Sequence, residues 1–252
     1  MQDKHVVITG PTAGIGRATS LDLAARGARL SLLCRNLEKG AALSADIVAA
    51  GGIEPELVEM EMSDLSSVRR AAQELLDADR PIDVLLNNAG VVNTTRRLSA
   101  DGYEETLAVN HFAPFLLTGL LLPLLQRAQG ARIVNVSSGA HAFVRGMGFD
   151  DMQAEKGFST FTEYGRSKLA NILFTRSLAR RLEGQGITVN CLHPGAVATS
   201  LGTQNDGFIS RLLPKLLKPF FRTPEKGAST SIYLCSSPEL QHVTGEYFVN
   251  SR

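Results

Sequence analysis

The chain has 252 residues, of which 44% are hydrophobic and 20% are charged, and this is enough apolar material for one large α/β domain or two small ones. Its 26 Lys and Arg side chains nearly balance 25 Asp and Glu, so the net charge of +1 gives no reason to expect nucleic acid or an acidic membrane as a partner. Three widely spaced cysteines fit neither a disulfide framework nor a metal site, so we expect no metal and a cytoplasmic protein.

The N-terminus leads directly into a strand-like run, and the longest apolar stretch, Phe112 to Leu125, is too short to span a membrane. We therefore expect neither a signal peptide nor a transmembrane segment, and we interpret the apolar stretch as a buried helix.

Short β-branched runs alternate with longer helical patterns along the whole chain. The predicted strands are His5–Thr9, Arg29–Cys34, Ile53–Met60, Val84–Asn87, Arg132–Ser137, Thr188–Leu192 and Tyr247–Val249. The predicted helices are Ile15–Arg26, Leu37–Ala50, Ser66–Asp77, Ala100–Arg127, Thr162–Leu182 and Glu225–Cys235. Because the strands are nearly continuous apolar runs, we expect a parallel sheet covered on both faces. The absence of a linker predicts one doubly wound α/β domain over residues 1–252, with ligands beyond the carboxyl ends of the strands.

A glycine cluster follows the first predicted strand and leads into a helix, in the sequence Thr9-Gly10-Pro11-Thr12-Ala13-Gly14-Ile15-Gly16. Glycines allow a tight turn and a close approach to a pyrophosphate, which a helix N-terminus attracts. The alternative is a tight strand-to-helix turn that binds nothing. The second strand ends at Cys34-Arg35-Asn36, where enzymes that use NAD place a carboxylate on the ribose. A guanidinium there pairs with a 2′-phosphate instead, so NADP(H) is the expected cofactor. Arg17 is expected to add positive charge.

Four polar side chains follow between residues 110 and 168. Tyr164 and Lys168 are four residues apart on one predicted helix face, where an adjacent cation is expected to lower the pKa of the phenol. Ser138 follows the fifth predicted strand and could hydrogen-bond a substrate oxygen. Asn110 lies inside a long predicted helix, although Asn is a poor helix former. These residues also fit a surface pair, a capping serine and a tolerated asparagine, but their gathering at one sheet edge favours catalysis.

Residues 196–223 depart from the strand–helix rhythm and form a predicted substrate lobe. From Gly207 to Thr223, apolar and basic residues alternate and two prolines interrupt any helix. Three interpretations remain open, namely a mobile lid over an apolar pocket, a basic segment that touches a membrane surface, and a helix pair at an oligomer interface.

Taken together, these motifs resemble the short-chain dehydrogenase/reductase family over nearly the whole chain. The matching motifs are Thr9–Gly16, Asp64-Leu65, Asn87-Asn88-Ala89-Gly90, Asn110, Ser137-Ser138, Tyr164-to-Lys168 and His193-Pro194-Gly195. The resemblance implies a single-domain, Rossmann-type, seven-stranded sheet and an oxidoreductase that interconverts a carbonyl and an alcohol. It also implies a homodimer or homotetramer.

The resemblance assigns roles to the matching positions. Tyr164 becomes the general acid/base, Lys168 holds the nicotinamide ribose, Ser138 orients the carbonyl and Asn110 supports a proton-relaying water. The implied cofactor-binding residues are Gly10, Thr12, Gly14, Ile15, Gly16, Arg35, Asn36, Asp64, Leu65, Asn88, Ala89, Gly90, Tyr164, Lys168, Pro194 and Gly195.

The segment between Ser138 and Tyr164 is longer than in the bacterial ketoacyl reductases of this family. That segment, with Cys34-Arg35-Asn36 and Thr244-Gly245-Glu246-Tyr247-Phe248, resembles the retinol dehydrogenase-like branch, here expected without its membrane anchor. A bulky hydrophobic aldehyde, ketone or alcohol is the expected substrate. The alternative is a catalytically silent NADP(H)-binding sensor or scaffold, but such proteins usually replace the tyrosine or the lysine. A sugar-nucleotide epimerase fits less well, because it carries a different glycine motif and a larger C-terminal domain.

Overall fold

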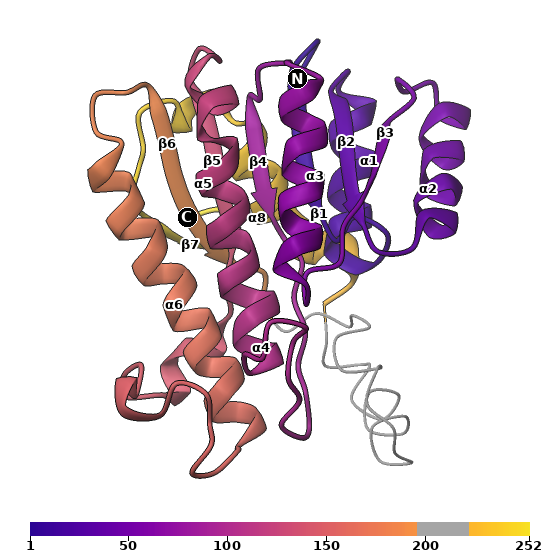
Figure 1. The fold of residues 1–252 in the computed structure, drawn as a ribbon. Helices are drawn as coiled ribbons and strands as arrows, with labels where there is room; N and C mark the ends of the chain where they lie inside the picture. The colour runs from indigo at the N-terminus through magenta and orange to yellow at the C-terminus, as the bar shows by residue number, and fades with distance from the viewer. Residues whose placement is uncertain (196–221) are drawn as a thin grey trace.

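Seven parallel strands form one sheet in the order β3-β2-β1-β4-β5-β6-β7 in the computed structural model, which describes residues 1–195 and 222–252 (Figure 1). The strands are β1 (His5–Thr9), β2 (Arg29–Cys34), β3 (Glu56–Glu59), β4 (Val84–Asn87), β5 (Ala131–Val136), β6 (Ile187–His193) and β7 (Tyr247–Val249). This confirms the predicted doubly wound, seven-stranded fold. Four strands have the predicted bounds, whereas β3 is shorter than expected because it pairs only with Ser31–Cys34 of β2.

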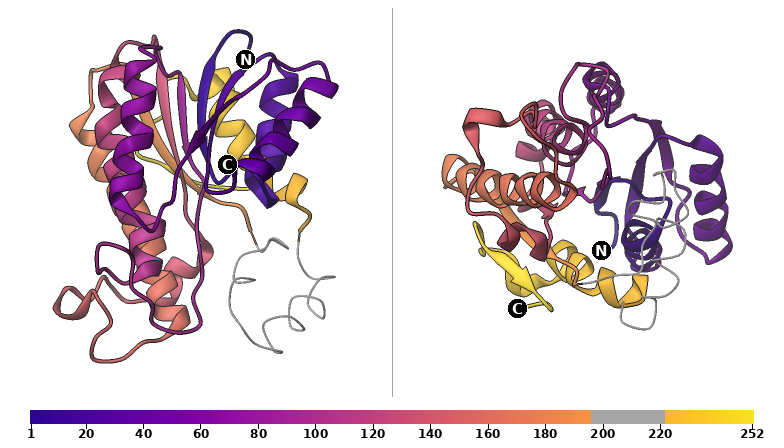
Figure 2. Two further views of the ribbon diagram at one scale, coloured as in Figure 1. Left: turned by 45° about the vertical axis from the view of Figure 1, so that its right-hand side comes forward. Right: turned by 90° about the horizontal axis from the view of Figure 1, so that it is seen from below.

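Helices cover both faces of the sheet (Figures 1 and 2). The first set is α3 (Leu65–Asp77), α5 (Ala113–Gln126) and α6 (Thr160–Arg181). The second set is α1 (Gly14–Ala25), α2 (Leu37–Ala49) and α8 (Pro224–Ser236). The predicted substrate lobe lies outside the described residues, except for its last two positions, Arg222 and Thr223.

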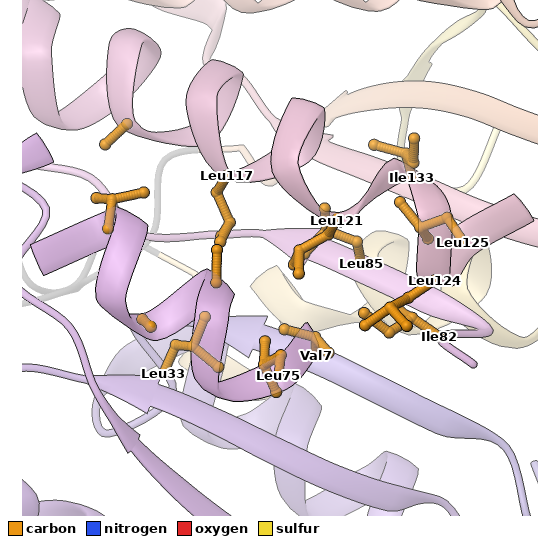
Figure 3. Packing of buried hydrophobic residues seen from close by; sticks show 14 of the residues in the cluster. Val7, Leu33, Leu75, Ile82, Leu85, Leu117, Leu121, Leu124, Leu125 and Ile133 are labelled. Carbon is orange, nitrogen blue, oxygen red and sulfur yellow. The ribbon is translucent and has the colours of Figure 1, made fainter. Parts of the chain in front are cut away.

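Successive residues of the central strands supply two separate cores. Val7 and Leu85 face the α3–α5–α6 side, together with Leu117 and Leu121 of α5 (Figure 3). Their sequence neighbours, such as Val6 and Leu86, face the other side with residues of α1, α2 and α8. Because both faces are buried, the strands carry apolar residues without alternation, as parallel strands do.

The long apolar helix predicted before β5 is interrupted near its start. A short helix α4 (Glu105–Leu107) leads into a π-helical turn (Ala108–Phe112) and then into α5. The run Glu105–Gln126 is long and apolar enough to cross a membrane, but 56% of its most apolar window is buried inside the fold. Leu117, Leu121, Leu124 and Leu125 all lie in the core, so packing against the sheet accounts for the apolar character of this helix.

The strand order reverses direction between β1 and β4, since the chain runs outward from β1 to β3 and then crosses back to β4. Loops that leave the two neighbouring strands diverge there and open a crevice at the carboxyl edge of the sheet. This edge lies at the bottom of Figure 1, where the loops after β4 and β5 also gather.

Candidate active site

A cavity of about 490 Å³ lies at this crevice and runs from the end of β2 to the start of α6. It is lined by most of the residues selected from the sequence: Gly10, Thr12, Gly14, Ile15, Gly16, Arg35, Asn36, Asn88, Ala89, Gly90, Ser138, Tyr164, Lys168, Pro194 and Gly195. Three selected residues, Asn110, Asp64 and Leu65, do not line it. The cavity therefore joins the predicted nucleotide end and the predicted catalytic end in one continuous site.

The loop after β1 requires glycine for two reasons, a left-handed backbone conformation and a close approach of two backbone segments. Gly10 and Gly14 have φ of 63° and 53°, a left-handed conformation that side chains disfavour. A Cβ on Gly16 would lie 2.3 Å from the Gly10 carbonyl oxygen, so the loop could not fold back on the helix. No side chain caps the N-terminus of α1, whereas Asn36, Asp64 and Thr223 cap α2, α3 and α8. The free N–H groups of α1 therefore face the cavity and favour an anion.

Asn88 fastens this loop to the neighbouring strand. Its side-chain amide donates to the carbonyl oxygens of Thr9 and Gly10 at 3.0 and 3.1 Å. The Thr9 hydroxyl in turn accepts from the backbone N–H groups of Asn88 and Ala89, both at 3.0 Å. Although Asn88 lines the cavity, its side-chain nitrogen and its backbone N–H are engaged in shaping the glycine loop.

Basic and acidic side chains meet where β2 and β3 end. Arg35 is largely exposed and its guanidinium lies 3.3 Å from the carboxylate of Glu61. Lys39, one helical turn further along the chain, also lines the cavity, a position that the sequence patterns missed. Arg17, by contrast, pairs with Asp46 at 2.6 Å and does not line the cavity. The positive charge at this end of the cavity therefore comes from Arg35 and Lys39.

Asp64 and Leu65 do not line this cavity, and their assignment to the cofactor site stays a prediction. Asp64 caps α3, where its carboxylate accepts from the backbone N–H of Ser66 at 2.8 Å. Met60, Glu61, Met62 and Ser63 line the cavity instead. The Asp-Leu motif selected a residue that caps a helix. A search for residues directly after the third predicted strand would have found Glu61 and Met62, which line the cavity.

Tyr164, Ser138 and Lys168 converge at the other end of the cavity. Tyr164 and Lys168 lie one turn apart on α6, and the Lys168 ammonium is 5.6 Å from the centre of the phenol ring. Lys168 is only 3% exposed and its ammonium donates to the Val136 carbonyl oxygen at 3.1 Å. Ser138 follows β5 and forms a hydrogen bond with the phenol of Tyr164.

The pKa shifts of Tyr164 and Lys168 differ from those expected from the sequence. Burial raises the pKa of Tyr164, and the hydrogen bond to Ser138 offsets only part of the rise. Burial also lowers the pKa of Lys168 to about 8. The predicted lowering of the phenol pKa by Lys168 is therefore not found, because desolvation is the larger effect. At neutral pH Tyr164 is a protonated phenol and so is in the form that donates a proton.

Asn110 lies in the π-helical turn and is completely buried behind the cavity wall. Its side-chain oxygen accepts from the Val91 N–H at 2.7 Å, and its amide donates to the Val91 carbonyl and to Ser167. The amide of Asn171 donates to the Asn110 main-chain carbonyl at 2.9 Å. In this π-helical turn, both the backbone carbonyl and the side chain of Asn110 therefore form hydrogen bonds with other segments of the chain. Such turns are frequent at functional sites. Its role in a proton relay stays a prediction.

The long segment between Ser138 and Tyr164 forms loops at the catalytic edge (Figure 2). Phe143, Phe149 and Phe161 are 68%, 78% and 70% exposed there, and the rings of Phe143 and Phe161 meet edge to face. Arg166 anchors the segment by donating to the Asp151 carbonyl oxygen and by pairing with the buried Glu163. Among residues 1–195 and 222–252, no cluster of three His, Cys, Asp or Glu side chains could hold a metal ion.

Comparisons with known proteins agree with these features. A family model described as short chain dehydrogenase matches residues 4–207. Retinol dehydrogenase 14 of Mus musculus is 44% identical, over 98% of this chain and 78% of the relative. Retinol dehydrogenase 12 of Mus musculus is 41% identical, over 97% of this chain and 77% of the relative.

Solved structures show the same architecture. A short chain dehydrogenase from Pseudomonas syringae superposes with a TM-score of 0.77 at 27% identity, covering 98% of this chain and 94% of that one. A chain from Beutenbergia cavernae, described as an NAD(P) dependent gluconate 5-dehydrogenase with bound NADP, superposes with a TM-score of 0.78 at 27% identity. That superposition covers 99% of this chain and 96% of the other.

Proposed function

The chain belongs to the short-chain dehydrogenase/reductase family, in its retinol dehydrogenase-like branch, and on this premise we propose that it is an NADP(H)-dependent oxidoreductase acting on a hydrophobic substrate. The reaction interconverts an aldehyde or ketone and the corresponding alcohol. The observation that carries the proposal is the single cavity that holds Arg35 at one end and Tyr164, Ser138 and Lys168 at the other.

The nucleotide end of the cavity fits a dinucleotide phosphate. The uncapped N-terminus of α1 and the space that Gly16 leaves beside Gly10 suit a pyrophosphate. Arg35 and Lys39 supply two cations near the end of β2, which supports a 2′-phosphate. The pair between Arg35 and Glu61 is exposed and therefore weak, so a 2′-phosphate could compete for the guanidinium.

The catalytic end supplies the proton and orients the substrate oxygen. The cofactor would provide the hydride, and the protonated phenol of Tyr164 would donate to the oxygen of the reduced carbonyl. The Ser138 hydroxyl, already bonded to the phenol, would hold the same oxygen. The buried ammonium of Lys168 would hold the ribose and keep positive charge beside the phenol. The dry surroundings of Tyr164 and Lys168 strengthen these interactions.

Exposed aromatic side chains near Tyr164 in the sequence support a hydrophobic substrate. Phe143 and Phe149 lie in 3₁₀ turns before α6 and Phe161 in its first turn, and all three expose large apolar surfaces, although none lines the cavity. Such surfaces are favoured where an apolar body is to be removed from water. The named relatives are retinol dehydrogenases, which agrees with a substrate of this class.

We extend the proposal to a cytoplasmic homodimer or homotetramer. Cys34, Cys191 and Cys235 are all free and buried, which suits a reducing compartment. Phe115 of α5 and Leu173 of α6 are 56% and 47% exposed, and such exposed apolar side chains on neighbouring helices support self-association.

The cofactor assignment is tested by Arg35→Asp, with steady-state reduction of decanal as the assay. Wild type is expected to prefer NADPH, because a charge-assisted contact with the 2′-phosphate contributes about 1.5–3 kcal/mol. In Arg35→Asp that attraction becomes a repulsion, so the ratio of kcat/KM for NADPH over NADH should fall by roughly 10–100-fold.

Arg17→Asp is the matched control, since the same charge reversal then falls on a residue outside the cavity. It should leave the cofactor ratio unchanged. An equal change in both variants would show a general electrostatic effect, and an unchanged ratio in Arg35→Asp would contradict the 2′-phosphate contact.

A further inference from the structure

The hydroxyl of Tyr247 lies between two imidazole rings beside the catalytic end. It is 2.6 Å from Nδ1 of His193 and 3.4 Å from Nδ1 of His141. The His141 ring packs edge-on against Tyr247, with ring centres 5.2 Å apart. None of the three residues has a role in the reaction described above, and they come from three separate parts of the chain.

The sheet register explains this meeting. Tyr247 of β7 pairs with Cys191 of β6, and His193 lies two residues further along β6, so both side chains point to the α6 side of the sheet. His141 lies in the short 3₁₀ turn Gly139–Phe143 that follows β5, the strand next to β6. The end of β7 thus faces the loop that carries Ser138.

The proton positions follow from what each partner can accept. The Ser138 carbonyl oxygen accepts from the backbone N–H of His141 and lies 2.7 Å from His141 Nδ1, which must therefore carry a hydrogen. Because that nitrogen is a donor, it cannot accept the Tyr247 hydroxyl hydrogen. The hydroxyl therefore donates to Nδ1 of His193, which requires His193 to be neutral with its hydrogen on Nε2.

The two ends of this chain of contacts reach both halves of the active site. His141 holds the backbone of Ser138, whose hydroxyl contacts the phenol of Tyr164. His193 directly precedes Pro194 and Gly195, which line the cavity. We propose that Tyr247 is a positioning residue that, through His141 and His193, holds Ser138 at a fixed place relative to Pro194 and Gly195. This inference rests on the proposed function.

The physical reason is that hydride transfer is sensitive to small displacements of the reacting groups. The reacting carbonyl must be held by Ser138 while the nicotinamide lies against Pro194 and Gly195, and a shift of about 1 Å between them can lower the rate by about 100-fold. Catalytic groups are therefore held by a second set of contacts that lock their geometry. The adjacent Ser137 is held to β6 and α6 by hydrogen bonds to the carbonyl oxygens of Leu192 and Lys168. Ser138 itself has only local contacts to Ala140 and His141, so a contact from β7 adds a constraint on its position.

The bridge is expected to depend on pH through His193. The titratable and charged groups that act on His193 are His141, Arg222 and Tyr247, and Cys191 lies beside Tyr247. Burial, with the charges of His141 and Arg222, holds the pKa of His193 below its usual value, and burial raises the pKa of Tyr247 to about 12. Tyr247 thus stays a donor at neutral pH. Protonated His193 would instead donate to the Tyr247 oxygen, which reverses the hydrogen bond and leaves the hydroxyl hydrogen facing His141 Nδ1, itself a donor, so the bridge is weakened.

Tyr247→Phe tests the bridge, since it removes the hydroxyl and keeps the ring against His141. We expect kcat for aldehyde reduction to fall about tenfold, with KM for NADPH nearly unchanged, because the ring loses its hydrogen bond to His193 and Ser138 is then no longer fixed relative to Pro194 and Gly195. Tyr233→Phe is the matched control. It removes a hydroxyl bonded to Glu239 on a ring that packs against Phe248, the neighbour of Tyr247 in β7, and should leave kcat unchanged.

The pH profile separates positioning from a structural role. Wild-type kcat should decline in acid as His193 is protonated, at a pH lower than that at which an ordinary histidine titrates, because its pKa is lowered. His193→Asn, whose side-chain oxygen can accept near the Nδ1 position, should keep neutral-pH kcat without this decline. In Tyr247→Phe, kcat should already be low at neutral pH. It should not decline further in acid, and it should not rise as the pH is increased.

The inference would be overturned if Tyr247→Phe kept the kcat of the wild type. It would also be overturned if kcat of His193→Asn declined in acid as the wild type does. A loss of kcat that only follows a loss of Tm, and that Tyr233→Phe shares, would also overturn it. Absence of turnover in wild type contradicts the proposed function and the inference together, whereas normal wild-type turnover with an unaffected Tyr247→Phe contradicts the inference alone.

Discussion

Tyr164→Phe is expected to lower kcat by about 100- to 10,000-fold, which is the usual contribution of a positioned general acid. The change removes the proton that the substrate oxygen receives but keeps the ring beside Lys168. Since burial raises the pKa of Tyr164, the wild-type phenol is protonated throughout the neutral range, so the fold loss in Tyr164→Phe should be the same at every pH between 6 and 8. The dissociation constant for NADPH should stay nearly the same.

The measurement combines steady-state kinetics with a fluorescence titration of NADPH. Tyr103→Phe serves as the control, because Tyr103 is half-exposed at the packed edge of Phe112, away from the cavity lining. If Tyr164→Phe kept most of the wild-type kcat, the proton would come from another group. If it lost NADPH binding instead, Tyr164 would be a cofactor ligand and not the acid.

Lys168→Met is expected to abolish turnover and at the same time to stabilise the fold. Burial lowers the pKa of Lys168 from 10.5 to about 8, and a shift of this size corresponds to about 3 kcal/mol of unfavourable burial of the charge. Methionine has a similar length and no charge. The loss of the hydrogen bond to Val136 offsets about 1 kcal/mol, so a rise in Tm of several degrees at pH 7 is expected.

The pH dependence gives this prediction its sign. The folded pKa lies below the unfolded value, so the burial penalty is fully present below pH 8 and disappears as the pH rises toward 10.5. The Tm advantage of Lys168→Met over wild type should therefore shrink between pH 8 and 10.5. Lys226→Met, at an exposed position, should show no such advantage. A lower Tm for Lys168→Met at pH 7 would show that the ammonium stabilises the fold.

The sequence predicted the sheet well because parallel strands leave an unambiguous signal. His5–Thr9, Arg29–Cys34 and Val84–Asn87 are continuous apolar runs that are buried on both faces, and their bounds agree with the structure. The start of the long helix was placed too early, at Ala100 instead of Glu105, and its π-helical turn was not foreseen. Such a turn depends on tertiary partners of Asn110, in particular Val91 and Asn171, which are distant in sequence.

Site residues could be predicted from the sequence where a short motif determines its own local backbone structure. The glycine loop and the Tyr164–Lys168 spacing define their own structure, and both line the cavity. Glu61 and Lys39 were missed because each lies at the cavity only through strand or helix ends that the fold brings together. Asp64 was selected by its letter pattern; its carboxylate caps α3, and its contact with the cofactor stays a prediction. The raised pKa of Tyr164 was also not foreseen, because burial cannot be judged from spacing.

The central claim, that the chain transfers hydride from NADPH to a hydrophobic carbonyl, is tested most directly by isotope transfer. Purified protein would be incubated with NADPH carrying deuterium at both hydrogen positions of nicotinamide C4 and with either decanal or propanal, and the alcohols would be analysed by mass spectrometry. We expect decanol with one deuterium on the carbinol carbon, formed with a higher kcat/KM than propanol, because each methylene removed from water contributes up to about 0.8 kcal/mol. Unlabelled alcohol, or no alcohol from any carbonyl while NADPH still binds, would contradict the account.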